Sequence, residues 1–113
     1  MRIQAVTICI SNLEVSRRFY EEILGFEPDA AYERWQSYQS EGRAFLGIME
    51  VPGFVRAPSQ DIINIIVADV NGLWARIRDR VAVESPPTMM PWGTYKMVIL
   101  DPDGYRIGLL DDR

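Results

Sequence analysis

The sequence contains no histidine, and this absence removes most of the common arrangements of catalytic side chains. A Ser-His-Asp triad and a Cys-His pair both use an imidazole as the general base, so neither can be built here. A transition-metal site would have to consist of carboxylates and a single thiol, whereas imidazole is the commonest nitrogen ligand. Enzyme classes that depend on histidine are therefore excluded.

Cysteine is nearly absent as well. Cys9 is the only cysteine, so the chain cannot form an internal disulfide. Proteins without disulfides are typical of reducing compartments. We therefore expect a cytoplasmic protein. The first expected strand begins close to Arg2 with no basic-then-apolar leader, which predicts that no signal peptide is present.

Long apolar runs and basic clusters are also missing. No uninterrupted apolar run approaches the length that crosses a membrane. The 12 basic and 16 acidic residues give a net charge of −4, and no basic stripe is available to neutralise phosphates. We expect neither a membrane nor a nucleic acid as partner. The mild acidity fits a neutral or cationic small molecule somewhat better than an anion.

The chain is long enough and apolar enough to form a real core. Its 113 residues are 48% hydrophobic, which argues against disorder. This length corresponds to one domain, or to two half-domains that share a core.

The first half of the chain alternates between strand and helix patterns. Residues 3–10 alternate apolar side chains with smaller, more polar ones, which predicts a strand. Residues 11–14 have the spacing of a capping box, and Gly25 is a suitable helix end. Two short strands are expected within residues 26–39 and another over 44–51. The helix that starts at residues 11–14 and ends at Gly25 should bury Val15, Phe19, Ile23 and Leu24.

Residues 52–60 are rich in proline and glycine and are predicted to form a linker, after which the pattern restarts. A strand over 61–67 leads to Asp69, a helix cap. The second helix should bury Val70, Leu73, Trp74, Ile77 and Val81. A short strand near 81–84, a proline-rich loop over 86–93, and a hairpin of 95–100 with 106–110 should follow. Asp101-Pro102-Asp103-Gly104 is a tight-turn sequence between those last strands.

The two halves are predicted to be repeats. The cap residues Asn12 and Asp69 are 69 − 12 = 57 positions apart, and this offset superposes the alternating faces of strands 3–10 and 61–67. The halves also end alike, at residues 45–50 and 106–111. The domain organisation is therefore one domain over 1–113, with module 1 at about 1–51, a linker at 52–60 and module 2 at about 61–113.

Four motifs in order along this doubled pattern resemble a known family. They are the run Ser11–Phe26, the segment Val67–Val70, the pair Trp92-Gly93 and the turn that begins at Asp101. Together they resemble the vicinal oxygen chelate superfamily, which includes glyoxalases, bleomycin-resistance proteins and extradiol dioxygenases. The resemblance implies an α+β fold of two tandem βαβββ modules, whose sheets curve around a shared cavity, and it implies a homodimer.

The same resemblance bears on metal binding. Enzymes of that superfamily hold a divalent metal with His, Gln or Glu side chains on the first and last strand of each module. The corresponding positions here are Ala5, Gly47, Ile62 and Gly108. None of these side chains can donate an electron pair, and a register shift by one residue brings apolar residues inward instead. We therefore expect no metal and no other cofactor.

An organic ligand is the predicted occupant of such a metal-free cavity. Gly47 and Gly108 would either open room for it or allow close packing of strands. The aromatic residues would line its walls or form ordinary core. Arg106 would either pair with an anionic group of the ligand or bridge to a surface acid. The predicted cavity residues are Thr7, Trp35, Phe45, Gly47, Met49, Asn64, Trp92, Arg106 and Gly108.

Three functions fit these observations. The first is a metal-free binding protein that sequesters a drug or an aromatic metabolite, like the drug-resistance members of the family. The second is a divergent lyase, isomerase or dioxygenase-like enzyme, with Tyr38, Tyr95, Glu50 or Cys9 as acid or base. The third is a structural or regulatory dimer without a ligand. We favour the first, because no pattern brings two acid or base groups together, and we assign no catalytic residue.

Overall fold

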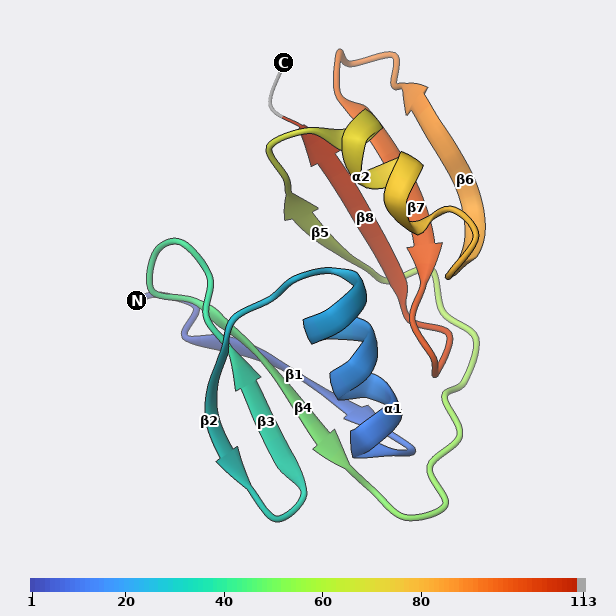
Figure 1. Ribbon diagram of the computed structural model, residues 1–113. Coiled ribbons are helices and arrows are strands. Elements are labelled where there is room, and N and C mark those ends of the chain that lie inside the picture. The colour runs from blue at the N-terminus through green and yellow to red at the C-terminus, as the bar shows by residue number, and fades with distance from the viewer. Residues whose placement is uncertain (112–113) are drawn as a thin grey trace. The chain divides into compact units, whose positions relative to one another are not determined.

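The structure is a computed structural model that describes residues 1–111, and the chain divides into two units, Met1–Arg56 and Ala57–Arg113. Each unit contains one four-stranded mixed sheet with helix on one of its faces (Figure 1). The strand orders are β1-β4-β3-β2 and β5-β8-β7-β6, so the second sheet repeats the first. The predicted α+β fold of two βαβββ modules is confirmed. Residues 112–113 of the expected second module lie outside the described part.

The first unit runs from a parallel strand pair through an antiparallel hairpin. β1 pairs in parallel with β4, and this register sets Thr7 opposite Gly47. β3 then pairs with both β4 and β2 in antiparallel fashion. The elements are β1 (Ala5–Ile10), α1 (Leu13–Arg17), the π-helical segment η1 (Arg18–Ile23), β2 (Pro28–Tyr32), β3 (Trp35–Tyr38) and β4 (Phe45–Glu50).

The first helix begins one residue later than the Ser11-to-Glu14 capping box predicts. Asn12 is the cap, and its side-chain oxygen accepts a hydrogen bond from the Val15 amide at 3.1 Å. The Leu13 amide has no acceptor within the helix and donates a hydrogen bond to the Glu50 carboxylate at 2.8 Å. A carboxylate from the end of β4 therefore stabilises the helix start, where the helix dipole favours negative charge.

The buried side of this helix also differs from the expected one. Val15 is 44% exposed, whereas Ser16 and Tyr20 are fully buried beside Phe19. The buried residues Ser16, Phe19 and Tyr20 are still at helical spacing. The helix continues as a π-helical segment, in which the Leu24 amide donates to the Phe19 carbonyl at 3.0 Å. A pattern based on 3.6 residues per turn does not anticipate that wider turn.

The second unit repeats this arrangement around its own core. Asp69 caps the helix as predicted, because its carboxylate accepts from the Gly72 amide at 3.0 Å. β5 pairs in parallel with β8, and Asn64 stands opposite Gly108. The elements are β5 (Ile62–Ile66), α2 (Val70–Ile77), β6 (Ala82–Met89), β7 (Tyr95–Leu100) and β8 (Arg106–Asp111). The fully or nearly fully buried residues include Val70, Leu73, Ile77, Met97, Ile99, Ile107 and Leu109.

β6 corrects the prediction of a short strand followed by a proline-rich loop. The strand continues through Pro86 and Pro87 as far as Met89. It lies at the edge of the sheet, where proline is tolerated because one side of the strand needs no ladder hydrogen bonds. Its pairing with β7 is irregular on both sides of Ser85. The loop is thereby reduced to a short turn after Met89.

The hairpin of β7 and β8 is confirmed, and the first residue of its turn is buried. Asp101 is 5% exposed, and its Oδ1 accepts hydrogen bonds from the amides of Asp103 and Tyr105, both at 2.9 Å. Gly104 has φ of 88°, a conformation that favours glycine. Within residues 1–111, no helix has the length and apolar character needed to span a membrane.

Candidate functional site

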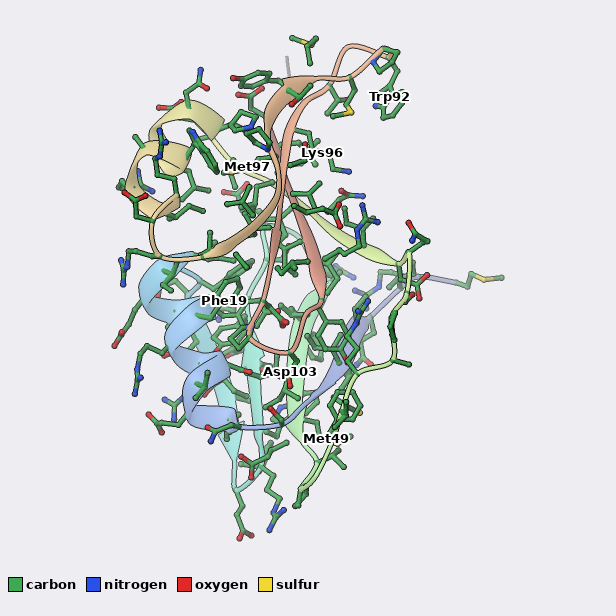
Figure 2. The ribbon with its side chains drawn as sticks, turned by 90° about the vertical axis from the view of Figure 1, so that its right-hand side faces the viewer. Phe19, Met49, Trp92, Lys96, Met97 and Asp103 are labelled. Carbon is green, nitrogen blue, oxygen red and sulfur yellow. The ribbon has the colours of Figure 1, made fainter. Side chains whose placement is uncertain are left out.

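Each sheet has one face covered by the helix of its own unit and one face that this helix does not cover, which we call the open face. In the first unit, alternation along the strands places Thr7, Phe45, Gly47 and Met49 on the open face. Figure 2 shows Met49 on the side of the sheet away from α1, whereas Phe19, a buried residue of η1, lies on the helix side. Trp35 is opposite Met49 in the register of β3 with β4 and shares this face.

The Trp35 ring fills the space that the missing side chain of Gly47 leaves. A Cβ built on Gly47 would overlap the benzene part of the indole, with Cζ2 at 2.7 Å and Cζ3 at 2.9 Å. Gly47 is buried, and Trp35 is only half-buried. Glycine at this position therefore allows an aromatic ring to pack in the middle of the open face.

The remaining predicted residues of the first unit surround this ring. Thr7 is exposed on β1, directly opposite Gly47. Met49 is 39% exposed, and Phe45 is half-buried on the same strand. The structure thus brings all five predicted residues of this unit to one face, with mainly apolar surface and one hydroxyl.

The open face of the second unit carries a residue that sequence reasoning missed. A Cβ on Gly108 would overlap Asn64 Oδ1 and would lie 2.6 Å from Lys96 Cε and 3.2 Å from Ile62 Cδ1. Side chains from β5 and β7 therefore converge over Gly108 on β8. The signal for Lys96 is its position between apolar residues of a buried strand, since it alternates with Met97, which faces α2 (Figure 2).

Two further predicted residues have other surroundings. The Arg106 guanidinium binds the Glu84 carboxylate, with Nε to Oε1 at 2.9 Å and Nη2 to Oε2 at 2.7 Å, and donates to the Gln60 carbonyl at 2.7 Å. This hydrogen-bonded guanidinium holds the pKa of the Glu84 carboxyl below its usual value. Of the two partners expected for Arg106, a ligand anion or a surface acid, the structure shows the surface acid. Trp92 is 73% exposed in the turn between β6 and β7 (Figure 2).

The groups considered for an enzymatic role are mostly engaged elsewhere. Tyr38 is buried on the helix side and donates to Glu21 Oε2 at 2.8 Å. Tyr95 donates to Asn71 Oδ1 on α2 at 2.7 Å, and Glu50 accepts from the start of α1. Cys9 alone of these four groups alternates onto an open face.

The donor set does not fit a metal. The four residues that the resemblance maps to the metal-ligand positions have side chains without a donor atom; they are Ala5, Gly47, Ile62 and Gly108. Within residues 1–111, no three histidine, cysteine, aspartate or glutamate side chains come together in a group that could hold an ion. No chemistry of this chain is therefore assigned to a metal.

Comparisons with known proteins agree with this architecture. The family model described as the Glyoxalase/Bleomycin resistance protein/Dioxygenase superfamily matches residues 2–109. No curated protein matches the chain in sequence. Among solved structures, a protein of unknown function from Agrobacterium tumefaciens has a TM-score of 0.87 at 18% identity, over 100% of this chain and 95% of that chain.

Two other solved structures differ in their described activities. TnmS3, an antibiotic binding protein from Streptomyces sp. CB03234, is 27% identical with a TM-score of 0.79, over 100% of this chain and 97% of that chain. Lactoylglutathione lyase from Agrobacterium tumefaciens is 18% identical with a TM-score of 0.76, over 97% of this chain and 92% of that chain. Similar folds therefore serve both binding and catalysis.

Proposed function

Because the chain belongs to the Glyoxalase/Bleomycin resistance protein/Dioxygenase superfamily, we propose that it is a metal-free member that binds and sequesters a flat aromatic small molecule. The observation that carries this proposal is the Trp35 indole seated on Gly47 in the middle of the open face. The aromatic ring stands where a metal-binding member would present a ligand side chain. Stacking on a ring thus replaces coordination to an ion as the source of binding energy.

The surroundings of Trp35 suit an aromatic ligand. Met49 supplies a flexible, polarisable wall, and Phe45 adds a second ring on the same strand. Thr7 offers one hydroxyl that both donates and accepts hydrogen bonds. An apolar lining with few polar groups is the usual composition of small-molecule sites.

The comparison with TnmS3 supports sequestration rather than turnover. That protein is an antibiotic binding protein, and it matches this chain along its whole length. In this chain, three of the four groups considered as acid or base are held by contacts with the helices. We further propose that the protein works as a cytoplasmic homodimer, as the family resemblance implies.

Tryptophan substitutions test the proposal directly. The three tryptophans are Trp35, Trp74 and Trp92, and Trp92 is a matched control because it is exposed in a turn. The probe is phenylnaphthylamine, a neutral aromatic amine whose fluorescence rises on transfer to an apolar site. We expect Trp35→Leu to weaken its binding about tenfold, as the loss of an aromatic anchor does.

Trp92→Leu should leave the dissociation constant unchanged within about twofold, because an exposed turn residue contributes little binding energy. Circular dichroism of both variants checks that they are folded. Equal binding by the Trp35→Leu variant, or absence of binding by the unmodified protein, would overturn the proposal.

A further inference from the structure

The second open face presents one ammonium group among mostly apolar residues, with the paired Arg106 and the Asn64 amide on the same face. Lys96 is the only lysine of the sequence, and it lies on β7, a central strand of the sheet. It faces away from α2, on the side shared by Gly108 and Leu110 (Figure 2). Its neighbours on β8 and β7 along that face, Gly108 and Val98, are both buried.

Gly108 determines how the Lys96 side chain lies. With no Cβ on Gly108, the Lys96 stem crosses β8 so closely that its Cε is 2.6 Å from the position a Cβ would take. The Asn64 side-chain amide approaches the same point from β5. A side chain on residue 108 would push both groups apart, so the glycine is what lets the Lys96 stem and the Asn64 amide approach each other.

The Lys96 ammonium is complementary to a negative oxygen, because it has three donor hydrogens. The Asn64 atom beside Gly108 is the acceptor Oδ1, so this amide presents its two N–H donors to the same ligand only after a half-turn about its last side-chain bond. Within residues 1–111, no carboxylate forms an ion pair with Lys96, whereas Arg106 on the same face is paired with Glu84. The Lys96 charge is thus available to a ligand.

We propose, on the basis of the proposed function, that Lys96, with the Asn64 amide beside it, forms an oxyanion subsite on the open face of the second unit, and that this subsite takes an aromatic compound with an acidic group such as a carboxylate, sulfonate or phenolate. This reverses the preference that the net charge of −4 suggests. The local charge decides, because charges farther away than about 8 Å are screened at physiological ionic strength. Gly108, which the resemblance maps to a metal-ligand position, thereby makes room for the charged side chain of Lys96.

A matched pair of dyes tests this inference. Anilinonaphthalene sulfonate and phenylnaphthylamine share the same ring skeleton and differ in the sulfonate group. We expect Lys96→Met, which preserves the length of the side chain without its charge, to weaken sulfonate binding about tenfold, since charge-assisted hydrogen bonds are the stronger class. Binding of the neutral dye should change by less than about twofold, and Lys96→Arg should restore most of the sulfonate affinity.

Arg76→Met is the control for net charge. Arg76 is exposed on α2, on the opposite side of the sheet, and its substitution removes the same single positive charge. It should leave binding of both dyes unchanged. If Arg76→Met weakens sulfonate binding as much as Lys96→Met does, the loss of affinity comes from the change in net charge. The proposed subsite is then overturned.

The outcomes separate the two proposals. If the unmodified protein binds neither dye, the proposed function fails and the inference falls with it. If it binds both, and Lys96→Met weakens neither or weakens both equally, only the oxyanion subsite is overturned. A readout without substitution comes from isotope-labelled lysine, which gives a single set of side-chain NMR signals. Its ε-methylene signal should move with the sulfonate dye far more than with the neutral one, and equal movement would contradict the subsite.

Discussion

The Trp35 indole occupies the space above Gly47, so that a side chain on residue 47 and the aromatic ring at residue 35 exclude each other. The two residues lie on adjacent strands, β3 and β4, and Ser37 rather than Trp35 is the direct register partner of Gly47. The ring therefore reaches diagonally across the sheet to its seat. This relationship makes Gly47, which the family resemblance maps to a metal-ligand position, part of an aromatic surface.

Gly47→Ala should destabilise the protein by about 1–3 kcal/mol, the usual cost of inserting a group into a packed position. The cause is displacement of the Trp35 ring, so the cost should fall by about 1 kcal/mol or more when Trp35 is already Ala, since residues in contact are not additive. Urea unfolding of the two single variants and the double variant measures this coupling. If the two changes in unfolding free energy add to within about 0.5 kcal/mol, the packing of the Trp35 ring on Gly47 is contradicted.

Ser16→Ala should leave stability unchanged or raise it by about 1 kcal/mol. Ser16 belongs to α1, and its Oγ is buried and has no hydrogen-bond partner among the described residues. Alanine removes this unsatisfied group and has the higher helix propensity. Ser37→Ala is the matched control, because Ser37 is also buried but its Oγ accepts from the Ala30 amide at 3.0 Å. Thermal unfolding should show a loss for Ser37→Ala, and a similar loss for Ser16→Ala would refute the prediction.

Stability should fall in alkali because of Tyr38. Burial, reinforced by its hydrogen bond to the Glu21 carboxylate, raises the pKa of the Tyr38 phenol above its ordinary value. The unfolded chain loses this proton near pH 10 while the folded protein keeps it, so the free energy of unfolding decreases as pH rises through that range. The decrease reaches at most about 1.4 kcal/mol per pH unit for one proton.

Tyr38→Phe should lack this part of the pH dependence. The difference in unfolding free energy between the unmodified protein and Tyr38→Phe, measured in urea at about pH 9, 10 and 11, should shrink as pH increases. A difference that stays constant over this range would show that Tyr38 titrates with an ordinary pKa in the folded protein.

Substitution of Arg106 tests separately which positively charged side chain binds the acidic group of the ligand. Arg106→Met should leave the affinity for anilinonaphthalene sulfonate within about twofold, because the guanidinium is already bound by Glu84 and the Gln60 carbonyl. The substitution removes one charge from the same face as Lys96, so it is a stricter control than a residue on α2. A loss of sulfonate binding comparable to that of Lys96→Met would assign the anion to Arg106 instead.

Local sequence signals predict much of the fold. Alternation predicts the strands and Asp69 predicts a helix start, because each signal depends on neighbouring residues alone. The 57-residue offset predicts the repeat, because it needs only the comparison of two segments of the sequence. The π-helical segment and the continuation of β6 through Pro86 were not predictable in this way. The first has no signature in the local pattern of apolar residues, and the second depends on the position of β6 at a sheet edge.

The candidate site was predictable only as a list of positions. Alternation placed Thr7, Gly47, Asn64 and Gly108 on open faces, and the registers place them there. What fills the space over each glycine is decided by side chains on other strands, Trp35 in one unit and Lys96 in the other. Such contacts depend on diagonal packing across strands, which no periodicity in one strand reports. The cavity shared by the two modules stays a prediction.

The central claim is that this superfamily member binds an organic ligand without a metal. Its most direct test combines two readings on one sample purified without chelator: the metal content, and the titration of phenylnaphthylamine before and after dialysis against EDTA. We expect less than stoichiometric metal and the same dissociation constant in both titrations. A stoichiometric divalent metal, or binding that disappears with EDTA and returns with the metal, would contradict the account.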